Sequence, residues 1–301
     1  MVIDGRKIAE EFLEKLKKEI KILQPLQTLQ GNKQAQGRLR LAAVLVGNDQ
    51  EFKKFVELKG RVAEEAGISF KMHQFSKNIS NDDLVNEVIN ISDNSDSVLV
   101  ELPLPSHINT QAVLDAVPVE KDVDVLSSEG QARFYEVQLR RFFEVEYRIL
   151  PPAVEALKII LEKYNVDLKG KKAAVFGQGI LVGKPISYWL EQQGAEVFRI
   201  RSKTESPEKL SRKSDMIVSG VGKPGLINGE MIRDGAIIID FGYGKNSEGK
   251  MAGDVDFDSV VSKASLITPV PGGMGPVLIT AVLKNLVKLK RVSPIKLKIN
   301  E

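Results

Sequence analysis

The chain has 301 residues, 43% of them hydrophobic and 28% charged, which are the proportions of a folded globular protein long enough for two domains. Its 43 basic and 40 acidic residues are interspersed, which argues against binding to nucleic acid or to a membrane surface. The chain lacks cysteine and has two histidines, so disulfides and thiolate metal sites are excluded and we expect no metal site. No secretion signal or membrane-spanning segment is evident, and we therefore expect a cytoplasmic protein.

The first half of the chain is expected to alternate helices and strands. Apolar residues recur every four positions over residues 4–22, which predicts an amphipathic helix. A glutamine-rich stretch at 24–36 is expected to be an exposed connector. Such alternation is typical of a parallel sheet, whose ligands lie at the carboxyl ends of the strands. The expected strands are 39–46, 68–75 and 97–102, and the further expected helices are 51–66, 80–92 (with Ser80 as the N-cap) and 107–117.

Four side chains in this half are candidates for a site. Phe55 and Lys59 are four residues apart, so they share one face of the helix. Glu101 follows a buried strand directly, and Asp124 ends an acidic loop at the next crossover. The alternatives are a core contact for Phe55 and solvated positions for the three charged residues. Residues 130–148 have no clear pattern and receive no prediction.

The second half begins with a pattern typical of nucleotide binding. Residues 173–176 form an apolar run, as in a strand covered on both faces, and Gly177, Gly179 and Gly183 follow before a helix. Glycines at such a turn let backbone N–H groups approach a pyrophosphate at the positive end of the helix. The alternative is an ordinary strand-to-helix turn.

The second strand of this unit, residues 196–200, indicates which dinucleotide is preferred. Where an NAD-binding chain usually places an acidic residue on the ribose, this sequence has Arg199, Arg201, Ser202 and Lys203. Cations and a hydroxyl can hold a 2′-phosphate, so NADP is favoured, with NAD still possible; the alternative is a solvated basic loop. Three further strands are predicted at 216–220, 236–241 and 265–268, followed by a proline- and glycine-rich loop and a helix at 277–289 that we expect to return to the first domain.

Together these motifs resemble the bifunctional methylenetetrahydrofolate dehydrogenase/methenyltetrahydrofolate cyclohydrolase family over nearly the full length. Their order and spacing are highly specific. The motifs that carry the resemblance are Val46-Gly47 with Phe55-Val56 and Lys59, Glu101-Leu-Pro-Leu-Pro105, Lys121-Asp-Val-Asp124, Gly177 to Pro185, Gly253-Asp-Val-Asp256, and Thr268 to Pro276.

The resemblance implies an α/β fold with two domains and a homodimer. The folate-binding domain would span residues 1–147, completed by the C-terminal helix at 276–301, and would hold folate against a Rossmann-type domain at 148–275. The implied reaction in one-carbon metabolism is hydride transfer from methylene-tetrahydrofolate to NADP, followed by hydrolysis of the methenyl product to formyl-tetrahydrofolate.

The resemblance also implies roles for individual residues. Lys59 matches the lysine that positions and activates groups at the one-carbon centre, and Asp124 matches the carboxylate that hydrogen-bonds the pterin. With Glu101, these two make up the expected catalytic set. Phe55 replaces the family's stacking tyrosine. The expected loop over the substrate consists of Pro271, Gly272 and Gly273, and the expected cofactor contacts are Gly177, Gln178, Gly179, Arg201, Ser202 and Tyr243.

Several departures from the family pattern leave the activity open. Phe55 can stack on folate but cannot exchange a proton. Glu101 stands where a glutamine is usual, and an ion pair there would hold Lys59 protonated and make it a poorer base. Gln178 and Gly179 replace an arginine and a serine. Three hypotheses follow: the bifunctional enzyme, a dehydrogenase with impaired cyclohydrolase activity, and a non-catalytic relative that binds folate or nucleotide.

Overall fold

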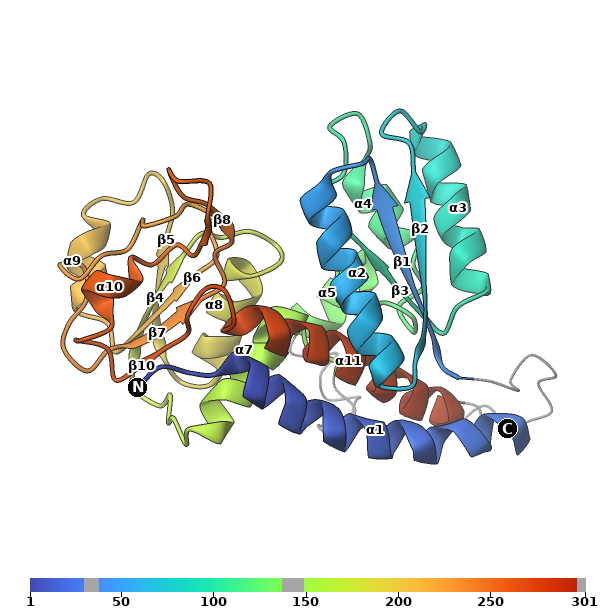
Figure 1. Ribbon diagram of the computed structural model, residues 1–301, viewed down its shortest axis with the longest axis horizontal. Helices are drawn as coiled ribbons and strands as arrows, with labels where there is room; N and C mark the ends of the chain where they lie inside the picture. The colour runs from blue at the N-terminus through green and yellow to red at the C-terminus, as the bar shows by residue number, and fades with distance from the viewer. Residues whose placement is uncertain (30–37, 137–148, 297–301) are drawn as a thin grey trace. The chain divides into compact units, whose positions relative to one another are not determined.

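The computed structural model describes residues 1–29, 38–136 and 149–296 (Figure 1). The chain forms two compact units. The three-stranded unit consists of Glu11–Pro152 and Ile279–Glu301, and the five-stranded unit consists of Met1–Glu10 and Ala153–Leu278. The expected boundary at residue 147 lies outside the described residues.

The three-stranded unit is built on a parallel sheet in the order β2-β1-β3. Its strands are β1 (Arg40–Val46), β2 (Ser69–Phe75) and β3 (Ser97–Val100). Its helices are α2 (Gln50–Glu65), α3 (Asn81–Asp93), α4 (Thr110–Asp115) and α5 (Ser128–Tyr135). The expected N-cap at Ser80 is confirmed, because its side chain accepts a hydrogen bond from the N–H of Asp83.

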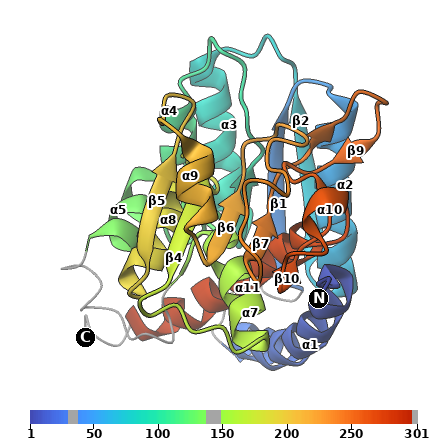
Figure 2. The same ribbon diagram turned by 90° about the vertical axis from the view of Figure 1, so that its left-hand side faces the viewer.

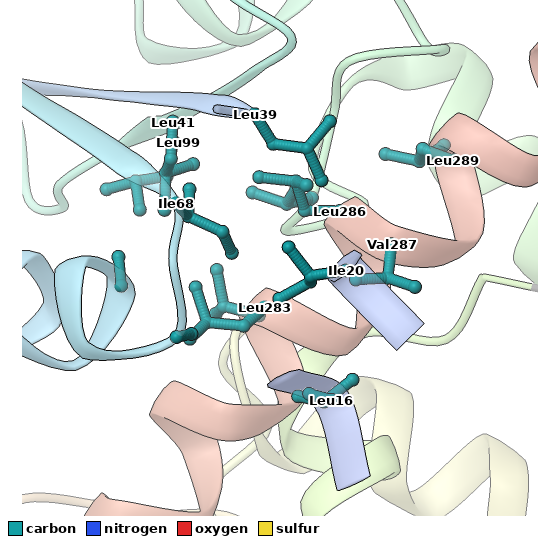
Figure 3. Close-up of a cluster of buried hydrophobic side chains, with 14 of the residues drawn as sticks. Leu16, Ile20, Leu39, Leu41, Ile68, Leu99, Leu283, Leu286, Val287 and Leu289 are labelled. Atoms are coloured by element: carbon teal, nitrogen blue, oxygen red, sulfur yellow. The ribbon is translucent and has the colours of Figure 1, made fainter. Parts of the chain in front are cut away.

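The central strand β1 is buried on both faces, which explains its continuous apolar sequence. Leu41 and Ala43 belong to one core, together with side chains of α1 and α11. Ala42 and Val44 belong to a second core on the opposite face, which α3 and α4 complete. The sheet therefore lies between two helical layers, and side chains of the first core are drawn in Figure 3.

Two long helices close the first of these cores. Helix α1 (Gly5–Leu29) runs seven residues beyond its expected end at residue 22, so part of the expected connector is helical; residues 30–36 lie outside the described part. Helix α11 (Met274–Lys296) begins before and ends after the expected 277–289. Leu16 and Ile20 of α1 share this core with Leu283 and Leu286 of α11 (Figure 3). The last helix thus returns to the three-stranded unit, as the sequence predicted.

The five-stranded unit contains a parallel sheet in the order β10-β7-β6-β4-β5 (Figure 2). With a three-stranded parallel sheet in the other unit, the predicted two-domain α/β fold is confirmed. The strands are β4 (Lys172–Phe176), β5 (Glu196–Ile200), β6 (Met216–Ser219), β7 (Ile237–Asp240) and β10 (Leu266–Ile267), with a β8–β9 hairpin (Gly244–Lys245 and Met251–Ala252). The helices are α7 (Pro152–Lys163), α8 (Gly183–Gln192), α9 (Pro207–Arg212) and α10 (Phe257–Val260).

The order of this sheet locates its ligand crevice. The chain leaves β4 toward β5 on one side and later returns to β6 on the other side of β4. Ligands of open parallel sheets bind at such a reversal point, beyond the carboxyl ends of the strands. Gly177 follows β4 at this point.

The first ten residues group with the five-stranded unit, although the sequence placed them in the folate-binding domain. The N-terminal ammonium group donates to the carbonyl of Ser265 (2.7 Å), and the N–H of Ile3 donates to Ile267 (2.8 Å). Through these backbone contacts the N-terminal segment pairs with the edge strand β10. The periodicity of the sequence does not indicate such pairing. Within residues 1–29, 38–136 and 149–296, no helix has both the length and the apolar character that a bilayer crossing requires.

Candidate active site

Lys59 and Glu101 form a close ion pair in the three-stranded unit. Lys59 lies on α2, and Glu101 directly follows β3 at the carboxyl edge of the sheet. The Lys59 Nζ to Glu101 Oε2 distance is 2.6 Å, and the two side chains are 13% and 10% exposed. A pair this well shielded from solvent has a stronger interaction than a surface pair, and each partner becomes costly to bury if the other is removed.

Phe55 lies one helical turn before Lys59, and its ring faces the ammonium group. The distance from Lys59 Nζ to the ring centroid is 4.6 Å, within the range of a cation–π contact. Two features fix the helix in this place. Asp49 caps it by accepting hydrogen bonds from Glu51 and Phe52, and any side chain at Gly60 would lie about 2.5 Å from the ring of Phe70 on β2. The predicted shared face of Phe55 and Lys59 is therefore present.

Asp124 reaches the same edge of the sheet through an isolated parallel bridge. Val98 of β3 pairs with Asp122 in parallel orientation. Counting two residues forward in both segments places Asp124 level with Val100, the residue before Glu101. Burial raises the pKa of Asp124 to about 7; the positive charge of Lys59 acts against this shift, and the negative charges of Asp122 and Glu101 add to it. The structure therefore brings together all three residues that the sequence proposed as catalytic.

The turn after β4 in the five-stranded unit fits a dinucleotide pyrophosphate. Gly177 has φ +81°, and a Cβ at Gly183 would lie 1.9 Å from the carbonyl oxygen of Gly177, so both positions require glycine. The N-cap of α8 is Val182, and no side chain caps this end of the helix. A Cβ at Gly179 would have no described atom within 4 Å. The turn thus offers space and the positive end of a helix to an anion.

Gln178 is directed into this turn rather than away from it. Its Nε2 donates to the carbonyl of Gly177 (2.7 Å) and is 3.2 Å from the hydroxyl of Ser187, a buried residue of α8. The side chain therefore braces the turn against the helix.

The two arginines near the end of β5 differ in what they contact. Arg199 pairs with Glu191 of α8, with 2.7 Å between Nη2 and Oε2. Arg201 and Ser202 follow the strand and are exposed, and Arg201 forms no ion pair with any described residue. Of the two arginines near the position expected for the ribose 2′-phosphate, Arg199 is thus paired with a carboxylate and Arg201, among the described residues, is not.

The other expected contacts of this unit also lie at the carboxyl ends of its strands. Tyr243 follows β7 and is 58% exposed. The segment of Pro271, Gly272 and Gly273 follows β10. It packs closely against the backbone of Gly5, where a Cβ would lie 1.8 Å from the carbonyl oxygen of Gly273. Phe55, Lys59, Glu101 and Asp124 belong to the other unit.

Two buried carboxylates hold the loops at this edge of the sheet, and neither was predicted to have a role from the sequence. Asp254 accepts hydrogen bonds from the hydroxyl of Ser219 (2.6 Å) and from the N–H groups of Val221 (2.7 Å) and Lys223 (2.6 Å). Asp240 accepts from Gly242 and Val255, and burial raises its pKa to about 6. The motif Gly253-Asp-Val-Asp256 was the only sequence feature that pointed to Asp254. It does not indicate which loops the Asp254 carboxylate connects.

Comparison with known proteins identifies the family. Residues 3–124 match the family model of the tetrahydrofolate dehydrogenase/cyclohydrolase catalytic domain, and residues 151–293 match that of the NAD(P)-binding domain. The chain belongs to this family. It is 39% identical to Bifunctional protein FolD of Mycoplasmopsis synoviae over 292 residues, which are 96% of this chain and 99% of the relative. The corresponding protein of Bacillus velezensis is 35% identical over 292 residues, covering 96% and 97%.

Solved structures of family members share the whole fold. The methylenetetrahydrofolate dehydrogenase-cyclohydrolase (FolD) of Trypanosoma brucei, solved with NADP cofactor and an inhibitor, has a TM-score of 0.87 at 31% identity and covers 97% of this chain and 98% of its own. The bifunctional FolD enzyme of Campylobacter jejuni has a TM-score of 0.86 at 30% identity, covering 97% and 99%. The resemblance drawn from the sequence motifs is confirmed.

The raised pKa of Asp124 in this family member predicts a pH-dependent stability. In the unfolded chain an aspartate has a pKa near 4, whereas Asp124 in the folded protein has a pKa of about 7. The raised pKa therefore contributes to the free energy of unfolding fully below pH 4, and this stabilisation is lost as the pH rises toward 7. Asp124→Asn should therefore gain stability relative to the wild type between pH 4 and pH 7, by up to about 4 kcal/mol. Urea unfolding at both pH values measures this difference.

Asp115→Asn provides a control with the opposite sign. Burial acts to raise the pKa of Asp115, but hydrogen bonds from Ser128 and Gln111 outweigh it and lower the pKa. This variant should lose stability relative to the wild type as the pH rises through the acid range. An Asp124→Asn difference that is equal at both pH values would contradict the assignment of a raised pKa.

Proposed function

We propose that this protein oxidises methylene-tetrahydrofolate to methenyl-tetrahydrofolate with NADP as the hydride acceptor, and hydrolyses the methenyl product to formyl-tetrahydrofolate. The observation that supports this most strongly is the convergence of Lys59, Glu101 and Asp124 at one sheet edge in a chain that matches both domains of the family. Spectrophotometric assays with methylene-tetrahydrofolate and NADP, following reduced cofactor and methenyl product separately, test it.

In the proposed folate site, each side chain has a role that its chemistry permits. The ring of Phe55 stacks on the pterin, and Asp124 forms hydrogen bonds with the polar edge of that ring system. With a pKa of about 7, Asp124 can act as donor or acceptor at neutral pH. Lys59 donates hydrogen bonds near the one-carbon group. During hydrolysis, water adds to the methenyl carbon and loses a proton, and the C–N bond then breaks as the released nitrogen takes up a proton.

The five-stranded unit is proposed to hold the cofactor. When bound, NADP supplies a nicotinamide ring that accepts the hydride. The backbone of Gly177 to Gly179 and the uncapped start of α8 fit its diphosphate, and Arg201 with Ser202 fits the 2′-phosphate. Tyr243 is proposed as a further contact, and the loop of Pro271, Gly272 and Gly273 is proposed to cover the substrate.

Arg201→Ala should distinguish NADP from NAD. Loss of a charge-assisted contact with the 2′-phosphate is expected to weaken NADP binding roughly tenfold to a hundredfold and to leave NAD binding unchanged. Fluorescence titration of each dinucleotide measures both affinities. Arg199→Ala is the matched control, because Arg199 is paired with Glu191 and should affect NADP binding less. Equal losses for NADP and NAD on replacing Arg201 would refute its proposed contact.

A dehydrogenase with impaired cyclohydrolase activity is the second candidate function. The observation that favours it is the 2.6 Å ion pair, in which Glu101 competes with substrate oxygens for the hydrogen bonds of Lys59. Phe55 also lacks the hydroxyl group that could assist proton transfer. Hydride transfer depends mainly on the positions of the two bound ligands, so it would suffer less than hydrolysis.

We also propose a homodimer. Strand β5 forms one edge of the five-stranded sheet, and within the described residues no strand pairs with its outer side. The opposite edge, β10, is bridged by Val2. An open edge strand can pair with a second copy of the same chain. Light scattering should give a mass of about twice 33.3 kDa, and a monomer mass at micromolar concentration would exclude this proposal.

A further inference from the structure

The loop that carries Asp124 is wrapped around the carboxylate of Asp122. Asp122 is 5% exposed, and its Oδ2 accepts hydrogen bonds from the N–H (2.8 Å) and the hydroxyl (2.7 Å) of Ser127. The backbone N–H groups of Val125 and Leu126 act on the same carboxylate and lower its pKa, against the larger effect of burial. A Cβ at Gly130 would lie 2.8 Å from the same oxygen. The loop therefore packs closely around the carboxylate of Asp122.

Val125, the residue directly after Asp124, has a backbone conformation that valine avoids. Its φ is +59°, in the left-handed region, where a β-branched side chain is strained. Such a conformation persists only when the surroundings enforce it. Asp122 accepts both hydrogen bonds of Ser127, two residues after Val125, so that carboxylate closes the turn in which Val125 lies. The direction of the chain on leaving Asp124 is thus set by Asp122.

Asn285 of α11 holds the residue on the other side of Asp124. Its Nδ2 donates to the carbonyl of Val123 (2.8 Å) and to that of Leu150 (2.8 Å), and Asn285 is completely buried. A polar side chain is costly to bury, and hydrogen bonds offset that cost only while both acceptors stay in place. The returning helix therefore fixes the peptide that leads into Asp124.

We propose that Asp122 and Asn285 are positioning residues that hold the carboxyl group of Asp124 at the pterin, by fixing the backbone after it and before it. The role of Asp124 itself rests on the proposed function. Neither residue lies among those that the sequence indicated as catalytic or binding, and neither needs to touch the substrate. Their effect should appear in folate-dependent kinetics and be absent from cofactor binding.

The test compares Asp122→Asn with Asp115→Asn in the full-length protein. Asp115 is a matched control because its carboxylate also accepts from the N–H and hydroxyl of a serine, Ser128, one residue beyond Ser127. An asparagine at position 122 places an amide N–H₂ against backbone donors, so the loop should shift. We expect kcat/KM for methylene-tetrahydrofolate to fall roughly tenfold to a hundredfold with Asp122→Asn and less than twofold with Asp115→Asn.

Two further measurements separate positioning from a general loss of structure. Affinity for NADP, followed by the fluorescence of Trp189, the one tryptophan of the chain, should be unchanged in Asp122→Asn. Adding Val125→Gly should restore much of the lost kcat/KM, because glycine adopts the left-handed turn without enforcement. The same substitution should not rescue Asn285→Leu, which releases the other side of Asp124.

The possible results distinguish a failure of the proposed function from a failure of the positioning role. A wild-type protein that binds NADP but does not act on the folate overturns the proposed function, and the positioning role with it. Turnover by the wild type, together with Asp122→Asn behaving like Asp115→Asn, overturns the positioning role alone. Reduced NADP affinity in Asp122→Asn, or no recovery on adding Val125→Gly, would also overturn it in favour of a purely structural role.

Discussion

Replacement of Lys59 by methionine is expected to lower methenyl hydrolysis by roughly 10² to 10⁴, the usual contribution of a group that assists proton transfer. Methylene oxidation should fall less, because it depends more on the positions of the ligands. The affinity for NADP should not change, since Lys59 belongs to the three-stranded unit. Rates of methenyl disappearance and of cofactor reduction measure the two effects separately.

Stability must be controlled in this experiment. Lys59→Met alone leaves Glu101 with a shielded and unpaired charge, which costs about 3–5 kcal/mol for a buried pair. The double variant Lys59→Met/Glu101→Gln removes that charge and should restore folding but not hydrolysis. Lys54→Met replaces an exposed lysine on the same helix and should be silent. Hydrolysis at the wild-type rate in the folded double variant would remove Lys59 from the mechanism.

Glu101→Gln is expected to raise methenyl hydrolysis by at least roughly tenfold. In the wild type the Glu101 carboxylate accepts a hydrogen bond from the ammonium group of Lys59 at 2.6 Å. A neutral amide at position 101 would compete less strongly with the substrate for the hydrogen bonds of Lys59. Methylene oxidation should change only a few-fold. The ratio of methenyl product accumulated to cofactor reduced is the most direct measure, and it should fall in the variant.

Glu65→Gln is a suitable control, because it breaks an exposed ion pair with Lys17 (3.0 Å) away from the site. Addition of Phe55→Tyr to Glu101→Gln should increase hydrolysis further if a phenolic hydroxyl assists proton transfer. A fall in hydrolysis with Glu101→Gln would mean that the carboxylate itself takes part in catalysis. In that case the second candidate function would lose its support.

The sequence was sufficient where local signals agree with the fold. The apolar run before Gly177 and the glycines after it predicted a strand, a turn and a helix, and the structure contains all three. The spacing of Phe55 and Lys59 predicted a shared helix face, which is present. The ion pair between Lys59 and Glu101 was expected once the family pattern showed that a carboxylate replaces the usual amide.

The remaining features depend on contacts between distant parts of the chain. Asn285 lies 162 residues from Val123, and periodicity places it on an apolar helix without indicating its partners. The left-handed conformation of Val125 lies in a turn that Asp122 closes through Ser127, and the amino-acid sequence does not show that contact. The contact between the Gln178 side chain and the buried Ser187 of α8 is likewise not indicated by the glycine pattern of the turn. Such outcomes are set by tertiary packing.

The measurement that tests the central claim most directly is the assay of the purified wild-type protein with methylene-tetrahydrofolate and NADP. We expect reduced cofactor to form, with methenyl-tetrahydrofolate building up before it is converted to formyl-tetrahydrofolate, because Glu101 slows the hydrolytic step. NADP binding without any reduction of the cofactor in the presence of the folate would contradict the proposed function.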